Sequence, residues 1–139
     1  SMAKEPSPPM RMTIALLEEL QKKYSVNSDR LYVTGISMGG FGTFDLLQRF
    51  PNKFAAAVPI CGGGDLTRAF MLTDIPLWVF HGTEDEVVHP EFSRSMVEAI
   101  RIAGGEIGYT EYPDEGHVGA WVQADRNPHS YEWLFSQER

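Results

Sequence analysis

Short apolar runs alternate with helical patterns along most of this 139-residue chain, and this alternation constrains the fold more than any other feature. The expected strands are residues 30–35, 54–60, 77–81 and 106–112, and the expected helices are 12–24, 41–49, 90–103 and 131–137. Strands that are joined through helices pair in parallel by right-handed crossovers. We therefore expect an α/β fold with three layers, in which helices cover both faces of a short, mainly parallel sheet.

Composition narrows the class of protein. A hydrophobic share of 42% suits one globular domain, which we place at residues 12–139 behind a Pro-rich, flexible lead-in over residues 1–11. The net charge of −7 argues against nucleic acid, because phosphate binding needs clustered Lys and Arg. No run approaches the roughly 18 apolar residues of a membrane-spanning helix, so a soluble protein is expected. Ser1 and Met2 resemble a cloning remnant, no signal peptide is visible, and the compartment, secreted or cytoplasmic, stays open.

The segment Gly35-Ile36-Ser37-Met38-Gly39 fits the pattern G-x-S-x-G. On its own this pattern is weak, but here it follows an expected strand and precedes an expected helix. In a nucleophile elbow, a sharp strand-to-helix turn lifts the serine out of the sheet edge, and glycines allow the strand and helix to pass closely. Ser37 is therefore the candidate nucleophile, and the alternative is a tight turn with an incidental serine.

A serine nucleophile needs a base, which a third group orients. Three acids, Glu84, Asp85 and Glu86, follow the third expected strand. Asp85 is preferred, because the spacing G-x-x-D-x-x-V turns one acid inward and leaves its two neighbours facing solvent. Among the four histidines, His117 follows the fourth strand in a loop that can reach both Ser37 and Asp85. A packing or loop-bracing role is expected for His81, and surface or helix-entry positions for His89 and His129.

With Ser37, Asp85 and His117 placed as a catalytic triad, the sequence resembles the α/β-hydrolase superfamily. The resemblance is to esterases of the predicted-peptidase, phospholipase/carboxylesterase and polyhydroxybutyrate-depolymerase-like group. It extends over nearly the whole chain from about Thr13, and it rests on residues 30–40, 60–65, 79–82, 85, 116–117 and 131–134. It implies cleavage of carboxylic esters, in some branches acetyl or feruloyl esters of plant polysaccharides, and it implies no cofactor.

The resemblance also brings out a departure. Sheets of this superfamily have about eight strands, and the nucleophile follows the fifth. Here one helical pattern precedes the first strand, so a truncated α/β-hydrolase fold is expected, with the backbone N–H of Met38 as its one evident oxyanion donor. The outer edge of the first strand would lie open, and open edges pair with other chains. We therefore expect a homodimer or a swapped oligomer that forms through this edge.

Other candidate residues have plainer interpretations. Cys61 is expected to be a small buried hydrophobe, since no further His–acid pair is placed for it. Trp121 is a candidate for lining the substrate site, although packing beneath His117 is favoured. The remaining loop acids lack ligand spacing with histidine, so no metal is expected; these acids are Asp65, Asp114, Glu115 and Asp125.

The sequence thus predicts a carboxylesterase-type serine hydrolase that works through an acyl-enzyme intermediate. Its expected substrates are small-molecule or polysaccharide-linked esters. A serine peptidase is the rival among enzymes. A non-catalytic or assembly-dependent hydrolase fragment is the rival from another class.

Overall fold

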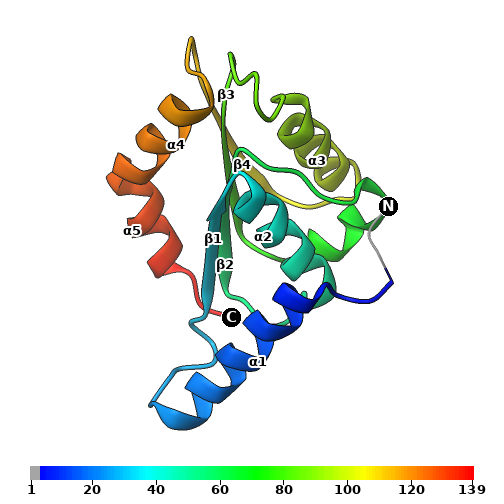
Figure 1. The fold of residues 1–139 in the computed structure, drawn as a ribbon, viewed down its shortest axis with the longest axis vertical. Helices are drawn as coiled ribbons and strands as arrows, with labels where there is room; N and C mark the ends of the chain where they lie inside the picture. Colours follow the sequence, from blue (N-terminus) through cyan, green and yellow to red (C-terminus); the bar gives the residue numbers. More distant parts are fainter. Residues whose placement is uncertain (1–3) are drawn as a thin grey trace.

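The structure is a computed structural model that describes residues 4–139 (Figure 1). Its helices are α1 (Pro8–Lys23), α2 (Met38–Arg49), α3 (Glu91–Ile102), α4 (His117–Arg126) and α5 (Pro128–Ser136), with a 3₁₀ helix η1 (Leu66–Leu72). Its strands are β1 (Tyr32–Ile36), β2 (Ala56–Ile60), β3 (Leu77–Gly82) and β4 (Ile107–Tyr112). Each expected strand and helix is present, with ends shifted by a few residues.

The four strands form one parallel sheet in the order β1-β2-β3-β4. The register pairs Val33 with Ala57 and Val79 with Tyr109. Because all four strands run the same way, their carboxyl ends share one edge of the sheet, toward the top of Figure 1. Loops that leave parallel strands at this edge are the usual place for a functional site in an α/β fold.

Two apolar cores lie on opposite faces of the sheet. On one face, Phe44 and Leu47 of α2 pack with Met96 and Ile100 of α3, and α1 adds partly buried side chains. On the other face, α4 and α5 cover a core that includes Phe80. The two sets of helices flank the sheet in Figure 1, so the predicted three-layer α/β/α architecture is confirmed.

Helix α1 begins at Pro8, four residues before the expected start, so residues 8–11 are helical and do not belong to a lead-in. Ser7 caps the helix, since its side chain accepts the N–H of Met10, and proline is tolerated in the first turn, where N–H groups have no intrahelical partner. Residues 1–3 of the expected lead-in lie outside the described residues.

Helix α4 and the 3₁₀ helix η1 were not expected from the sequence. The face of α4 that packs on the sheet is made of Ala120 and Ala124, which are fully or almost fully buried. Alanine allows a close approach but adds little to an apolar periodicity, so the pattern gives a weak helix signal. His117 consequently begins a helix, where a loop was expected.

The outer side of β1 pairs with no strand in the part of the chain that the structure describes. Helix α1 exposes Met12, Leu16 and Leu20, which are spaced four residues apart along one helix face. We call these three side chains the α1 stripe. Within residues 4–139, no helix is long and apolar enough to cross a membrane.

Candidate active site

Ser37 occupies a sharp turn between the end of β1 and the start of α2. Its backbone has φ 58° and ψ −117°, a conformation that non-glycine residues rarely adopt and that tends to be found at functional sites. Its N–H donates to the carbonyl oxygen of Ile60 at 2.9 Å, which ties the turn to the end of β2. A Cβ on Gly40 would lie only 2.5 Å from that same carbonyl oxygen, so α2 can start this close to β2 only with glycine at this position.

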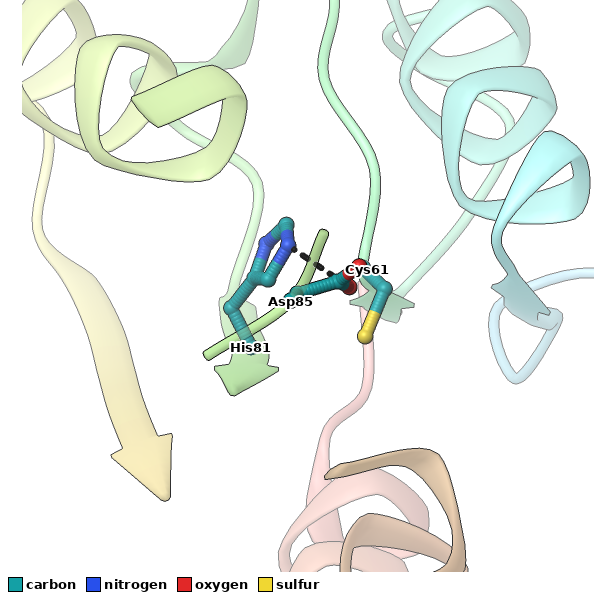
Figure 2. A group of neighbouring side chains, drawn as sticks. All are labelled: Cys61, His81 and Asp85. Atoms are coloured by element: carbon teal, nitrogen blue, oxygen red, sulfur yellow. Dashed lines mark ion pairs between the residues drawn. The ribbon is translucent and has the colours of Figure 1, made fainter. Parts of the chain in front are cut away.

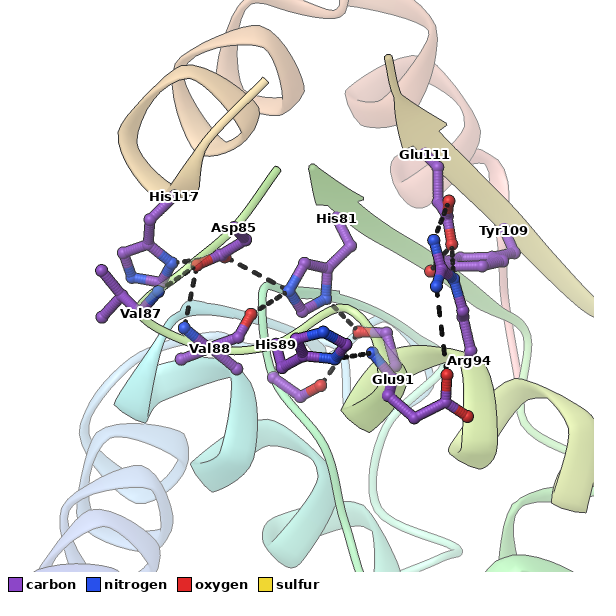
Figure 3. Close-up of polar contacts among 12 residues, drawn as sticks. His81, Asp85, Val87, Val88, His89, Glu91, Arg94, Tyr109, Glu111 and His117 are labelled. Atoms are coloured by element: carbon purple, nitrogen blue, oxygen red, sulfur yellow. Dashed lines mark hydrogen bonds and ion pairs between the residues drawn. The ribbon is translucent and has the colours of Figure 1, made fainter. Parts of the chain in front are cut away.

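Asp85 lies in the turn after β3, with a side chain that is fully buried. Its Oδ1 accepts the N–H groups of Val87 at 2.9 Å and Val88 at 2.8 Å (Figure 3). These bonds hold the carboxylate from within its own loop. Glu84 and Glu86 are exposed, so the expectation that one of the three acids turns inward is confirmed.

His117 is the first residue of α4, and it faces Asp85 across the end of the sheet. The distance between His117 Nδ1 and Asp85 Oδ2 is 2.6 Å, which is short for a hydrogen bond between nitrogen and oxygen and typical of a charge-assisted one. The His117 side chain is 14% exposed, so it is not fully buried although Nδ1 is engaged. The structure therefore brings together two of the three residues predicted as a triad.

Burial alone would raise the pKa of Asp85, because it disfavours the charged carboxylate. The hydrogen bond from His117 and those from the N–H groups of Val88 and Val87 outweigh this effect, so the pKa lies below its ordinary value. Asp85 is consequently ionised near neutral pH. An ionised Asp85 can only accept at Oδ2, and this places a proton on Nδ1 of His117.

Ser37 and His117, which both lie in the described part of the chain, are not joined by a hydrogen bond. Serine–base contacts are often long in unliganded enzymes and tighten with substrate. Met38, the predicted oxyanion donor, begins α2, where N–H groups lack intrahelical acceptors, and its side chain is 86% exposed. Trp121 is half-buried and packs against the core under α4, and its role in substrate binding stays a prediction.

Two buried residues beside Asp85 were not predicted as members of the site. His81, at the end of β3, has its Nε2 3.2 Å from Asp85 Oδ2, and Cys61, which follows β2, also lies against Asp85 (Figure 2). The bracing role expected of His81 is confirmed, since it bonds the Ser93 hydroxyl and the Val88 carbonyl. Its direct approach to the acid had one available signal, the spacing of four residues between His81 and Asp85.

Cys61, His81 and Asp85 offer ligand atoms within 4.8 Å of one another, a spacing that a metal ion could span. Burial and the neighbouring Asp85 raise the pKa of the Cys61 thiol to about 12, whereas metals bind the thiolate. The nitrogens of His81 and the oxygens of Asp85 are already engaged in hydrogen bonds. The donor set therefore suits a hydrogen-bonded cluster better than a metal site.

A parallel sheet between helices, a serine in a strained strand-to-helix turn and an Asp–His pair at the next strand ends define an α/β-hydrolase. The family model of the prolyl oligopeptidase family matches residues 9–79, which is just over half of the chain. The chain belongs to this family.

Individual relatives include both esterases and peptidases. A bifunctional acetylxylan esterase/xylanase from Neocallimastix patriciarum is 30% identical over 80% of this chain and 18% of its own length. A poly(3-hydroxyalkanoate) depolymerase from Paucimonas lemoignei is 38% identical over 34% of this chain and 12% of its own. The crystal structure of a thermostable esterase superposes with a TM-score of 0.93 at 40% identity, over 96% of this chain and 38% of that one.

More distant structures share the fold. The Pyrococcus horikoshii acylaminoacyl peptidase superposes with a TM-score of 0.80 at 18% identity, over 90% of this chain and 27% of its own. This chain thus spans less than two fifths of the length of each of these relatives.

Proposed function

We propose that this chain is a serine hydrolase that cleaves carboxylic esters through a Ser37–His117–Asp85 triad. The observation that supports this most is the 2.6 Å bond between His117 Nδ1 and a buried, ionised Asp85, at the sheet edge where the strained turn presents Ser37. A surface ion pair needs neither the burial nor the strained serine. Their combination is typical of a nucleophile elbow and its base.

The proposed reaction has two halves. His117 Nε2 takes the proton of the Ser37 hydroxyl while Oγ attacks the ester carbonyl, and the same proton then passes to the leaving alkoxide. His117 then takes a proton from water, which attacks the acyl-enzyme, and the imidazolium returns that proton to Ser37 Oγ as the acid leaves. Asp85 keeps the Nδ1–H tautomer in place and stabilises the imidazolium that forms in each half.

Charge that develops on the carbonyl oxygen needs donors that are fixed in advance. The N–H of Met38 is the donor that we assign, because the start of α2 leaves it without an intrahelical acceptor and the helix dipole favours negative charge there. We assign no second donor among the residues that the structure describes. Loss of one such donor typically lowers the rate by about 10²–10³-fold, so weak activity of this chain alone is consistent with the proposal.

Esters are favoured over amides, because an alkoxide leaves more readily than an amine. Two relatives bear the names of ester-cleaving enzymes, an acetylxylan esterase and a poly(3-hydroxyalkanoate) depolymerase. We therefore propose small or polymer-linked carboxylic esters as the substrate class. A peptidase is the second candidate, and the family description together with the shared fold of an acylaminoacyl peptidase supports it.

The proposal is tested by hydrolysis of p-nitrophenyl acetate and butyrate by the unsubstituted chain, Ser37→Ala and the control Ser136→Ala. Ser136 is exposed at the end of α5, so its replacement leaves the site intact. We expect turnover by the unsubstituted protein and by Ser136→Ala, and none by Ser37→Ala. Covalent labelling by a fluorophosphonate should follow the same order.

Equal inertness of three folded proteins, with no labelling of Ser37, would instead support a non-catalytic or assembly-dependent domain. Faster cleavage of an N-acylaminoacyl p-nitroanilide than of the matching ester would support the peptidase.

A further inference from the structure

The buried His81 approaches the same carboxylate oxygen that His117 uses. Its Nε2 lies 2.7 Å from the carbonyl oxygen of Val88 and 3.2 Å from Asp85 Oδ2 (Figure 3). A carbonyl oxygen cannot donate a hydrogen, and neither can an ionised carboxylate. Nε2 of His81 must therefore carry the proton, which it donates to the carbonyl oxygen of Val88 with Asp85 Oδ2 close beside it.

The other ring nitrogen of His81 is fixed from the opposite side. Nδ1 lies 2.7 Å from the Ser93 hydroxyl oxygen, which in turn lies 2.9 Å from the carbonyl oxygen of Gly62. Burial lowers the pKa of His81, so the ring is neutral at physiological pH, and the Ser93 hydroxyl hydrogen then lies between two acceptors. Ser93 belongs to α3, so the ring is held from β3, α3 and the Val88 loop together.

Asp85 Oδ2 thus faces two imidazole N–H groups, Nδ1–H of His117 and Nε2–H of His81. Each donor draws negative charge away from the other. His81 also binds the carbonyl of Val88, whose own N–H donates to Asp85 Oδ1 at 2.8 Å. Val88, which donates to Oδ1 of Asp85, is therefore held in place by His81, which lies next to Oδ2 of the same carboxylate.

We propose that His81 is a positioning residue, which shares Asp85 Oδ2 with His117 and thereby moderates the charge that the acid presents to the base. The inference rests on the proposed triad, since it concerns the same acid and base. Removing the shared donor should leave more negative charge facing His117 and make its imidazolium more stable.

The other titratable groups around His81 and Asp85 are as follows in the described part of the chain. Cys61, which follows β2, keeps its proton because burial and Asp85 raise the pKa of its thiol. Glu111 of β4 is paired with Arg94 of α3, at 2.9 Å between Oε2 and the guanidinium, and Tyr109 donates to the same carboxylate. From α4, the group that faces Asp85 is His117 itself.

The test follows the His117 titration by ¹H NMR in the Ser37→Ala background, so it needs no catalytic activity. The chain has four histidines, and single replacements assign their signals. The variants are His81→Leu, which removes the donor; His81→Gln, which offers an amide N–H in its place; and Ser93→Ala, which removes the Nδ1 partner while leaving Nε2–H. We expect an upward shift of the His117 pKa in His81→Leu, and values near that of the parent in the other two.

An unchanged or lowered His117 pKa in a folded His81→Leu variant would overturn the proposal, even if stability fell. If His81→Leu does not fold, the proposal is tested by the tautomer of His81 in the unsubstituted chain. A ¹H–¹⁵N spectrum at pH 7 must show the proton on Nε2, and a proton on Nδ1 alone would contradict the approach of an Nε2–H group to Asp85. If the protein is active, the acid limb of its kcat/KM profile should move to higher pH in His81→Leu. Failure of the proposed esterase function would be seen separately: the unsubstituted and Ser136→Ala proteins would be inert, while the His117 titration would still shift as expected.

Discussion

Gly35 lies where β1 passes closest to the start of α2, and its replacement by alanine should damage both folding and the position of Ser37. A Cβ at this position would lie 2.1 Å from the carbonyl oxygen of Gly39 and 2.8 Å from Oγ1 of Thr43. Ordinary van der Waals contact begins at 3.4 Å, so the backbone of β1 or α2 has to move by about 1.3 Å, the difference between 3.4 and 2.1 Å. A carbonyl oxygen within a helix cannot rotate away as a flexible side chain can.

Overpacking of this kind typically costs 1–3 kcal/mol, and we expect Gly35→Ala to lower the free energy of unfolding by about 2–3 kcal/mol. Ser37 lies midway between the two clashing residues and has to move with them. A displacement of about 1 Å at a reacting group costs on the order of 10²-fold in rate, so kcat/KM for p-nitrophenyl butyrate should fall by about that factor.

Urea denaturation followed by tryptophan fluorescence measures the first effect, and ester turnover measures the second. The matched control is Gly42→Ala, the same substitution in α2, where a Cβ would meet nothing within 4 Å. Alanine is the better helix former, so this variant should be more stable by about 0.5–1 kcal/mol with unchanged turnover. A Gly35→Ala protein with the stability and turnover of the unsubstituted chain would refute the steric argument.

Three further predictions concern the acid, pH and association. Asp85→Asn should reverse the favoured tautomer of His117 and lower kcat/KM by about 10⁴-fold, whereas Glu86→Gln, at an exposed neighbour, should leave it unchanged in the same assay. Thermal stability should fall as pH drops below about 6.5, because the lowered pKa of His81 in the folded chain means that the unfolded chain binds more protons. It should fall again below about 4, where the unfolded chain takes up protons that Asp85 and Glu111 resist in the folded chain. A melting temperature that is constant from pH 7 to 3 would contradict this. Light scattering should show a dimer of the 15.6 kDa chain that forms through the β1 edge and the α1 stripe, and Leu16→Glu should yield a monomer; an unsubstituted chain that stays monomeric at high concentration would count against it.

Sequence reasoning predicted the elements that depend on local patterns. The strand before Ser37 and the helix after it follow from periodicity and from the glycines of the motif, and the spacing of Gly82, Asp85 and Val88 singled out one acid of three. Each of these signals lies within a short segment, so it can be recognised from the sequence without knowing which distant residues meet. The roles of Met38 and Trp121, like the catalytic role of the triad itself, remain predictions.

The features that sequence reasoning missed depend on contacts between distant segments. Helix α4 was missed because its buried face consists of small residues. The contact of His81 with Ser93 and the Val88 carbonyl becomes visible only when β3 and α3 are placed in space, since no local pattern states which atoms meet in the core. That Asp85 has a second imidazole partner therefore had to come from the structure.

The burial of Cys61 means that the reactivity of its thiol depends on local opening of the chain around Asp85. It is the one cysteine of the chain, it is wholly shielded from solvent, and its thiol lies against Asp85. A thiol reagent can reach it only during moments when the residues around the acid separate, so its labelling rate, relative to that of the unfolded chain, gives the free energy of that local opening. Cys61 labelling thus measures how often this edge of the sheet opens, and it needs neither substrate nor mutation.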